Sequence, residues 1–182
     1  MHDKIGEVLF SVEQINERVK QLGEEITRDY AGKKVFLLGI LKGSMMFMAD
    51  LMRTIDLPVE VDYMCVSSYG ASTTTSGTVR ILKDLDANIE GKNVIIIEDI
   101  IDTGVTLSYL VKYLQGHNPN TLKICTMLNK PERRTAEVAV HYNGFDIPDK
   151  FVVGYGLDFA EEYRNLPYIG VLKPSAYSHL LK

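Results

Sequence analysis

Two apolar runs, each followed by a helical pattern, limit the folds open to this chain. Residues 33–41 (KKVFLLGIL) and 92–100 (KNVIIIEDI) are long enough to be strands buried on both faces of a sheet. Residues 45–55 (MMFMADLMRTI) and 106–118 (TLSYLVKYLQGHN) follow them with the pattern of helices. Strands that alternate with helices form right-handed β-α-β units. The sequence therefore predicts an α/β fold with a central, mostly parallel, twisted sheet flanked by helices.

The remaining segments fit the same organisation. Residues 11–31 carry apolar side chains at steps of three and four, which is typical of an amphipathic helix, and Ser11 with Gln14 can form a capping box at its start. Further strands are predicted at 58–69, 121–130 and 150–158, with a short one at 80–85. Because no repeat or linker interrupts the 182 residues, we expect one domain that spans 1–182.

Charge and composition exclude several classes of partner. The formal net charge is -4, so non-specific binding to nucleic acid is not expected, and any anionic ligand must be held by local groups. No apolar run approaches the ~20 residues that cross a bilayer, and the N-terminus lacks a secretory signal, so we expect a cytoplasmic protein without a membrane partner. Cys65 and Cys125 lie in apolar, β-branched settings without a CxxC pattern, which predicts buried, reduced thiols.

The segment 94–110 (VIIIEDIIDTGVTLSYL) carries the strongest chemical signal. Glu98 and Asp99 are predicted at the carboxyl end of a buried strand, pointing to opposite sides, and ligands bind at this end of parallel sheets. The bend that follows has backbone N–H groups without helical partners, which can hold a phosphate. The bend consists of Asp102, Thr103, Gly104, Val105 and Thr106. It lacks both the Walker pattern and G-x-G-x-x-G, so a single phosphate monoester fits it better than a triphosphate.

The acidic residues beside this bend need a different target, because carboxylates do not bind phosphate. Ribose hydroxyls or a hydrated Mg²⁺ suit Glu98 and Asp99, and a ribose 5-phosphate therefore suits the whole segment. The alternative is that Asp102 only caps a helix while the other two acids face water. We consider this weaker, because acids at the end of a buried strand are costly unless they are used.

These residues resemble a known motif. VIIIEDIIDTGVTL is similar to the phosphoribosyl pyrophosphate-binding motif of the type I phosphoribosyltransferases, and its acidic part resembles the variant found in the hypoxanthine-guanine branch. The resemblance implies the fold of that family, with a small hood formed by terminal segments. It also implies a reaction in which N9 of a purine displaces pyrophosphate from C1 of the ribose. In that reaction Asp102 would be the general base for N7, while Glu98 and Asp99 hold the ribose hydroxyls.

Three further segments extend the resemblance across most of residues 35–173. In LLGILKGSMMF, Leu41, Lys42 and Gly43 would form a pyrophosphate-binding loop, with a strained cis bond at Leu41-Lys42 or its neighbour. Arg164 would also contact pyrophosphate. Ser68 and Tyr69 would open a mobile loop, about 68–80, that closes over the reacting centre and excludes water.

The late segments would recognise the base and a metal ion. The resemblance implies that Lys130 bonds O6 of a 6-oxopurine, that Phe151 stacks on the ring, and that the Val152 backbone bonds its edge. Asp158 would lie near the metal or the base. The implied cofactor is Mg²⁺, with Glu98, Asp99 and Asp158 as its protein ligands.

Several alternatives stay open at this level. Hypoxanthine, guanine and xanthine differ only at C2, so a xanthine-preferring enzyme is one alternative, whereas Lys130 and Phe151 argue against adenine. A regulator that binds phosphoribosyl pyrophosphate without chemistry, sometimes on nucleic acid, is another, and the acidic balance and Asp102 speak against it. Some relatives carry a lysine where this chain has Val105, so its phosphate would depend more on backbone donors. Relatives form dimers and tetramers, so a homodimer or homotetramer is expected.

Overall fold

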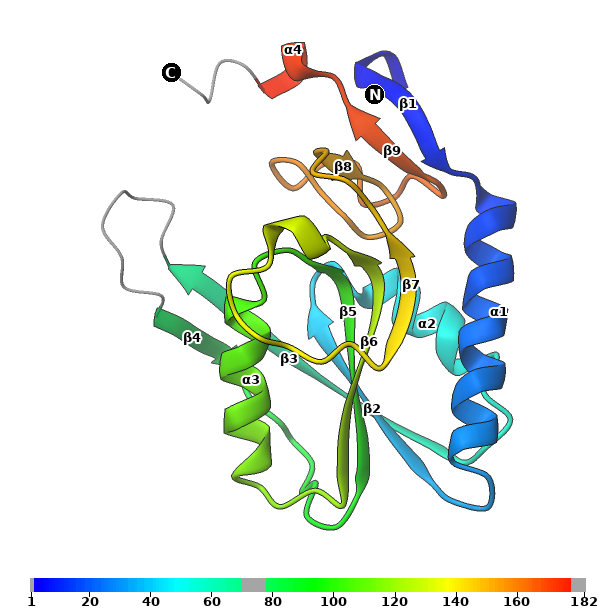
Figure 1. The fold of residues 1–182 in the computed structure, drawn as a ribbon, viewed down its shortest axis with the longest axis vertical. Coiled ribbons are helices and arrows are strands. Elements are labelled where there is room, and N and C mark those ends of the chain that lie inside the picture. The colour runs from blue at the N-terminus through cyan, green and yellow to red at the C-terminus, as the bar shows by residue number, and fades with distance from the viewer. Residues whose placement is uncertain (1, 70–77, 178–182) are drawn as a thin grey trace.

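The computed structural model describes residues 2–69 and 78–177, and the body of the protein is a six-stranded sheet (Figure 1). Its strand order is β4-β3-β2-β5-β6-β7. The strands are β2 (Val35–Leu41), β3 (Val59–Tyr69), β4 (Thr78–Lys83), β5 (Asn93–Ile101), β6 (Thr121–Asn129) and β7 (Tyr142–Asp146). Neighbouring strands are parallel except for β3 and β4, which are antiparallel. The predicted α/β fold with a mostly parallel sheet is confirmed.

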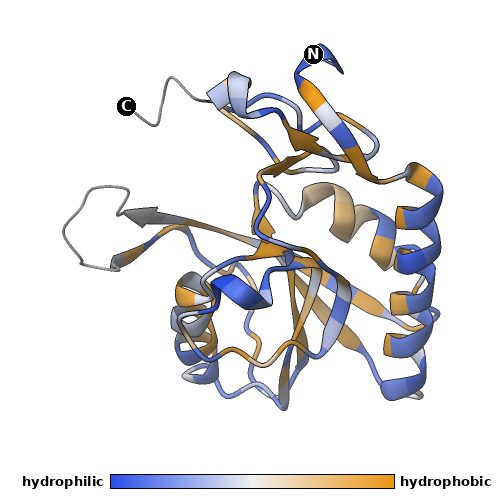
Figure 2. Cartoon of the chain, turned by 45° about the horizontal axis from the view of Figure 1, so that its top comes forward, coloured by the Kyte–Doolittle hydropathy of each residue, from blue (hydrophilic) through white to orange (hydrophobic). Residues whose placement is uncertain are grey.

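Helices cover both faces of this sheet, as Figure 1 shows. They are α1 (Val12–Asp29) and α2 (Met45–Met52) on one face and α3 (Val105–Gln115) on the other. The capping box predicted for α1 is present, because the backbone N–H of Gln14 donates to the Ser11 hydroxyl and that of Ser11 donates to the Gln14 side chain. The apolar stripe of α1 faces the sheet and its polar residues face outward (Figure 2). Within the described ranges, no helix is both long and apolar enough to cross a membrane.

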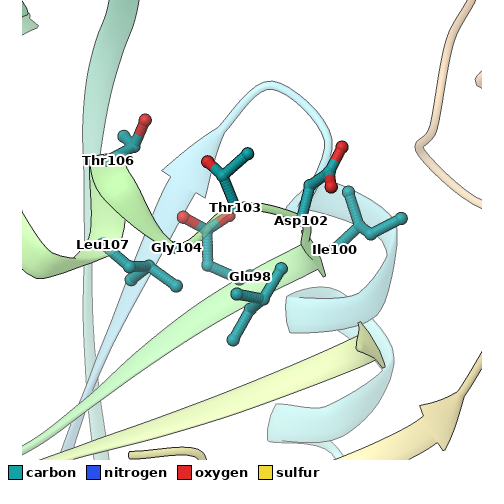
Figure 3. A pocket seen from close by; sticks show the side chains of 8 residues that line it. Glu98, Ile100, Asp102, Thr103, Gly104, Thr106 and Leu107 are labelled. Carbon is teal, nitrogen blue, oxygen red and sulfur yellow. The ribbon is translucent and has the colours of Figure 1, made fainter. Parts of the chain in front are cut away.

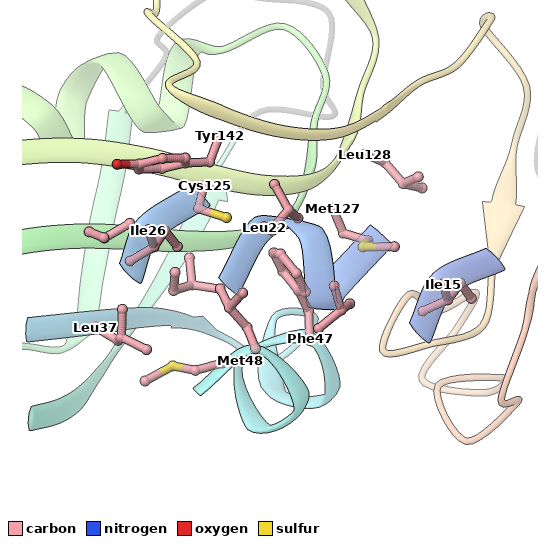
Figure 4. Close-up of a cluster of buried hydrophobic side chains, with 14 of the residues drawn as sticks. Ile15, Leu22, Ile26, Leu37, Phe47, Met48, Cys125, Met127, Leu128 and Tyr142 are labelled. Atoms are coloured by element: carbon pink, nitrogen blue, oxygen red, sulfur yellow. The ribbon is translucent and has the colours of Figure 1, made fainter. Parts of the chain in front are cut away.

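The pleat of β5 determines to which face of the sheet each of its side chains points. Ile95 and Ile97 pack into the core between the sheet and α1 and α2, part of which Figure 4 shows, whereas Ile96 packs into the core under α3. Glu98 and Asp99 continue the alternation. Glu98 lies on the α3 side, and Asp99 lies on the side of the loop that follows β2. The predicted opposite orientation of the two carboxyl groups is confirmed.

A second, three-stranded sheet forms a hood beyond the carboxyl ends of the central strands (Figure 1). It has the order β1-β9-β8, and all of its pairs are antiparallel. Its strands are β1 (Ile5–Phe10), β8 (Val152–Val153) and β9 (Ile169–Leu172), and three short helical turns accompany the fold at η1 (His2–Lys4), η2 (Pro131–Arg133) and α4 (Pro174–Tyr177). Both chain ends contribute to this sheet, so the expected hood of terminal segments is confirmed.

The strand predicted at 150–158 is wrong for most of its length. Only Val152–Val153 is extended and paired, because Gly154, Tyr155 and Gly156 follow with φ values of 97°, 50° and 98°. Positive φ cannot continue a strand, and the two glycines make that backbone accessible.

Strand β7 was not predicted, because its sequence YNGFD contains Asn, Gly and Asp, which are depleted in strands.

The two cysteines are both free thiols. Cys125 is buried as predicted, and burial raises the pKa of its thiol. Cys65 is only partly buried, because it lies on β3 near the antiparallel β4 rather than in the centre of the sheet. The expectation of burial is therefore correct for one cysteine and too strong for the other.

Gly23 yields a stability prediction whose sign opposes helix propensity. It lies in α1, and a Cβ built on it would lie 2.0 Å from Oγ1 and 2.8 Å from the carbonyl oxygen of Thr54. Alanine favours a helix interior over glycine by about 1 kcal/mol, but overpacking a close contact costs about 1–3 kcal/mol. We expect Gly23→Ala to lower the free energy of unfolding by about 1–2 kcal/mol, as measured by urea denaturation.

Thr54→Ala provides the matched control for this prediction. Combined with Gly23→Ala it removes the hydroxyl part of the collision, so the double variant should lose less stability than the sum of the two single variants. Additive losses, or a more stable Gly23→Ala protein, would contradict the packing argument.

Candidate active site

The candidate site lies at the carboxyl edge of the central sheet, where three neighbouring strands end. β2 ends at Leu41, β5 at Ile101 and β6 at Asn129, and these strand ends, together with the segments that follow them, carry most of the residues singled out from the sequence. Because parallel neighbours end at the same edge, the sheet brings these loops together from distant parts of the chain.

The bend after β5 encloses a pocket of about 280 Å³ (Figure 3). The pocket is lined by Glu98, Ile100, Ile101, Asp102, Thr103, Gly104, Thr106 and Leu107. Gly104 is the N-cap of α3 with a φ of 81°, a left-handed conformation that favours glycine. The N–H groups of the first turn of α3 have no helical partners, so the pocket combines backbone donors with two threonine hydroxyls. These are the groups that hold a phosphate monoester.

Contacts from the segment after β6 hold this bend in shape. The backbone N–H groups of Thr135 and Ala136 both donate to the carbonyl oxygen of Thr103, each at 3.0 Å. The guanidinium of Arg134 packs against the Cα side of Gly104, where a Cβ would lie 3.1 Å from Nη1. The bend is thus preorganised by a second loop. Val105 is partly exposed and brings no charge to it.

Glu98 is buried and Asp99 is half-buried, and the pKa of each carboxyl group is raised. Burial raises the pKa of Glu98 well above its usual value, and the neighbouring charge of Asp99 adds to the increase. Burial also raises the pKa of Asp99, to about 6, although the backbone N–H of Ile100 donates to its Oδ1 at 2.7 Å and lowers it. Consecutive acids at the end of a buried strand cost stability, and groups with pKa values perturbed in this way are concentrated at functional sites.

The loop after β2 is wedged between Asp99 and the hood side of the site. A Cβ on Gly43 would lie 1.6 Å from Oδ2 of Asp99, and a Cβ on Gly156 would lie 2.0 Å from the carbonyl oxygen of Gly43. Only glycine fits at either position. The peptide bond between Leu41 and Lys42 is cis, which is the first of the two positions left open by the sequence.

Arg164 belongs to the segment between β8 and β9, and it approaches Lys42 through Glu161, which lies 3.6 Å from its Nη2. Its Nη1 donates to the carbonyl oxygen of Gly156 at 2.8 Å, and its Nη2 pairs with Oδ1 of Asp158 at 2.8 Å. Lys42 pairs with Glu161 of that segment at 2.8 Å. The structure therefore brings together Lys42 and Arg164, the two cations assigned to one anion from the sequence.

Asp102 belongs to an ion-pair chain that the sequence did not predict. Nε of Arg133 lies 2.8 Å from its Oδ1, and Nη1 of Arg133 lies 3.2 Å from Asp149. Asp149 in turn pairs with the largely buried Lys130 at 3.3 Å. The hydrogen bond with Asp102, followed by that with Asp149, raises the pKa of Arg133. The only signal in the sequence was the charge run PERR directly after Lys130.

Phe151, two residues after Asp149, is 41% exposed. It stacks on Tyr177 with ring centroids 5.3 Å apart and meets Phe159 edge-on at 5.6 Å. Val152 follows it in the short edge strand β8, where it pairs with Val171. An exposed aromatic face held by two other rings is a suitable surface for stacking a planar base.

The structure assigns both ends of the predicted loop, about 68–80, to paired strands. Ser68 and Tyr69 are the last residues of β3, paired with Val79 and Thr78 of β4, so these positions are strand and not loop. β3 ends at Tyr69, as predicted from the sequence, whereas β4 begins at Thr78, two residues before the strand predicted at 80–85. Residues 70–77, the centre of the predicted loop, lie outside the described residues.

The three carboxylates assigned to Mg²⁺ do not form a ready metal shell. Across 2–69 and 78–177, no three His, Cys, Asp or Glu side chains gather in a group that could hold a metal ion. Glu98 lies on the opposite face of β5 from Asp99, whereas Asp158 is close enough for its charge to raise the pKa of Asp99. A cation beside Asp99 and Asp158 would therefore need oxygen ligands from the substrate.

Comparisons with known proteins agree with this geometry. The family described as phosphoribosyl transferase domain matches residues 11–160. The chain is 54% identical over 176 residues to the hypoxanthine-guanine phosphoribosyltransferase of Bacillus subtilis (strain 168), covering 97% of each chain. It is 52% identical to a crystal structure of hypoxanthine phosphoribosyltransferase from Staphylococcus aureus, with a TM-score of 0.94, covering 97% of this chain and 96% of that one. A crystal structure of hypoxanthine-guanine phosphoribosyltransferase from Bacillus anthracis, with a HEPES molecule in the active site, has 50% identity and a TM-score of 0.89, covering 92% of this chain and 99% of that one.

Proposed function

This chain belongs to the phosphoribosyltransferase family, and we propose that it transfers the 5-phosphoribosyl group of phosphoribosyl pyrophosphate to N9 of hypoxanthine or guanine. The products are a nucleoside monophosphate and pyrophosphate, so the protein is a transferase of purine salvage. The single observation that carries the proposal is the pocket at Asp102–Thr106, which combines backbone donors, threonine hydroxyls and acids. Together, these groups are sufficient to bind a ribose 5-phosphate.

The site divides the substrates among three loops. The bend with Thr103, Gly104 and Thr106 holds the 5-phosphate through backbone N–H and hydroxyl donors, with Val105 contributing only its backbone. Glu98 and Asp99, near the carboxyl end of β5, bind the ribose hydroxyls. Leu41–Gly43 and Arg164 bind pyrophosphate, whose negative charge Lys42 and Arg164 stabilise as it leaves.

The base enters between the ion-pair chain and the aromatic ring. The Lys130 ammonium donates to O6, Phe151 stacks on the purine, and the Val152 backbone bonds its edge. Asp102 is the first residue of the phosphate bend. A series of ion pairs through Arg133 and Asp149 connects it to Lys130. This position suits the general base that takes the proton from N7 while N9 attacks C1.

Asp99 and Asp158 are the residues that would hold Mg²⁺, together with substrate oxygens. Two carboxylates beside a pyrophosphate site fit this ion, which is commonly bound by one or two carboxylates plus phosphate oxygens. When bound, it would neutralise part of the charge that develops on pyrophosphate.

We further propose that the protein works in the cytoplasm as a homodimer or homotetramer, and that Ser68 and Tyr69 lead into a loop that closes over the site.

The direct test is incubation with phosphoribosyl pyrophosphate, Mg²⁺ and each of hypoxanthine, guanine, xanthine and adenine, while nucleotide formation is followed. Rapid turnover of hypoxanthine or guanine is the expected result. Preference for xanthine would correct the substrate. Binding of phosphoribosyl pyrophosphate without nucleotide formation from any base would identify a regulator and reject the proposal.

Lys130→Ala is expected to reduce the preference for 6-oxopurines. The buried ammonium pairs with Asp149 and with no other acid in the described part of the chain, and it is the donor that O6 requires and that the 6-amino group of adenine cannot use. We expect kcat/KM for hypoxanthine to fall ~10- to 100-fold, which matches the loss of one charged hydrogen bond, while KM for phosphoribosyl pyrophosphate changes little. Competition between hypoxanthine and adenine measures the preference.

Lys123→Ala is the matched control, because this lysine lies at the opposite end of β6. Its kinetic constants should stay near those of the unchanged protein. Unaltered base selectivity in Lys130→Ala would remove Lys130 from the base site.

A further inference from the structure

Glu161 holds the two cations that the proposed function assigns to pyrophosphate. Its Oε2 lies 2.8 Å from Nζ of Lys42 and 3.6 Å from Nη2 of Arg164. Lys42 lies on the loop after β2, 119 positions away in the chain, so this meeting is a product of the fold. Hydrogen bonding to Lys42 lowers the pKa of Glu161, which keeps its carboxylate anionic.

The backbone around Glu161 is arranged to place this carboxylate. Ala160, Glu161 and Tyr163 have φ values of 52°, 65° and 77°, a region that residues other than glycine rarely adopt. Asp158 supports the turn with both oxygens, because Oδ2 accepts the backbone N–H of Glu161 at 2.9 Å and Oδ1 pairs with Arg164 at 2.8 Å. One carboxylate thus fixes both the acid and one of its cationic partners.

The two cations retain donors that Glu161 does not use. Nε of Arg164 is buried and has no hydrogen-bond partner among the described residues. Lys42 is 62% exposed at its side chain, and in the ranges that the structure describes its ammonium donates only to Glu161, so two of its three N–H donors have no acceptor there. A buried, unpartnered guanidinium N–H is costly unless another acceptor reaches it. These donors match an anion with more oxygens than one carboxylate has, and a diphosphate is such an anion.

We propose that Glu161 is an internal competitor of pyrophosphate, which pairs with Lys42 and Arg164 as the product leaves and so lowers its affinity. The inference rests on the proposed function, since it takes Lys42 and Arg164 as the pyrophosphate-binding cations. Pyrophosphate carries several negative charges and displaces a single carboxylate. Once displaced, Glu161 remains near the bound product and repels it.

The geometry makes this competition reversible. The side chains of Lys42 and Glu161 are 62% and 66% exposed, and ion pairs between exposed groups are weak and screened by salt. Such a pair shifts an equilibrium only a few-fold, so it does not block the site but weakens binding of the product. Together with the repulsion, we expect a change of about three- to tenfold.

The test compares the variants Glu161→Gln and Glu162→Gln by titration calorimetry with inorganic pyrophosphate and Mg²⁺. Glu162 lies beside Glu161 in the same pocket of about 510 Å³, so its variant removes the same charge without removing an ion pair to Lys42 or Arg164. We expect Glu161→Gln to bind pyrophosphate about three- to tenfold more tightly and to be more sensitive to product inhibition. Glu162→Gln should stay within about twofold of the unchanged protein, because an exposed charge that forms no ion pair with either cation is screened by solvent and salt.

Salt and a second variant sharpen the result. The advantage of Glu161→Gln should shrink at 0.5 M KCl, since exposed charges are then largely screened. Glu161→Asn, whose side chain tolerates the left-handed backbone well, should reproduce it if the glutamine protein folds poorly. Equal affinity in Glu161→Gln and Glu162→Gln, or weaker binding in Glu161→Gln, would overturn the inference. The proposed function would fail separately, through absence of nucleotide formation by the unchanged protein.

Discussion

Asp102→Asn is expected to lower kcat by ~10²-fold or more while the fold is retained, in line with the loss of a general base. The amide keeps the shape of the side chain but cannot accept the proton from N7. Asp102 lines the rim of the phosphate pocket and is partly exposed, so the substitution leaves no cavity in the core. Binding of phosphoribosyl pyrophosphate should change little, because Thr103–Thr106 and their backbone donors remain. Steady-state kinetics with hypoxanthine, together with titration of phosphoribosyl pyrophosphate, separates the two effects.

A control is needed because Asp102→Asn also breaks the pair with Arg133. Arg133→Gln removes the same ion pair but preserves the carboxylate. Its turnover should fall only a few-fold, since the pair is exposed and contributes about 0–1 kcal/mol. If Arg133→Gln loses as much turnover as Asp102→Asn, the loss in Asp102→Asn comes from the broken ion pair and not from the missing general base. Normal turnover in Asp102→Asn would reject the assignment outright.

Gly156→Ala is expected to damage both stability and catalysis. A Cβ at this position would lie 2.0 Å from the carbonyl oxygen of Gly43, and its φ of 98° is itself unfavourable for alanine. The collision is with backbone, so the loop that carries Lys42 must move. We expect a loss of about 2–4 kcal/mol in the free energy of unfolding, from strain plus overpacking. Because we propose that the displaced loop binds pyrophosphate, we expect kcat/KM for phosphoribosyl pyrophosphate to fall ~10- to 100-fold.

Gly32→Ala separates strain from collision. Gly32 has a φ of 73°, but a Cβ there would have no atom within 4 Å. This variant should lose only about 1–2 kcal/mol, the cost of the left-handed backbone, and its kinetic constants should not change. Urea denaturation and steady-state kinetics on both proteins provide the comparison. Equal losses in the two variants would mean that the packing of Gly156 against the loop is unimportant.

Much of the fold was accessible from local patterns. The runs at 33–41 and 92–100 became β2 and β5, and the capping box at Ser11 starts α1, because burial on both faces and unpaired N–H groups impose local requirements on sequence. The strand predicted at 150–158 failed for a local reason as well. Gly154 and Gly156 permitted a positive φ, which apolar periodicity does not register.

The candidate site was accessible only in part. Asp102–Thr106 form one continuous segment, and the alternation of β5 was enough to place Glu98 and Asp99 on opposite faces. The pairing of Asp102 with Arg133 joins residues 31 positions apart across two loops, and that of Lys42 with Glu161 joins residues 119 positions apart. No periodicity in the chain links such residues.

The order of residues along the chain is thus sufficient for the strands, for the phosphate bend and for the chemical types gathered near it. Only the folded chain establishes that Gly43 is held between Asp99 and Gly156, and that Glu161 pairs with both Lys42 and Arg164. The physical reason is that hydrogen-bonding periodicity and burial act between near neighbours, whereas contacts between loops depend on how the strand ends are arranged across the sheet.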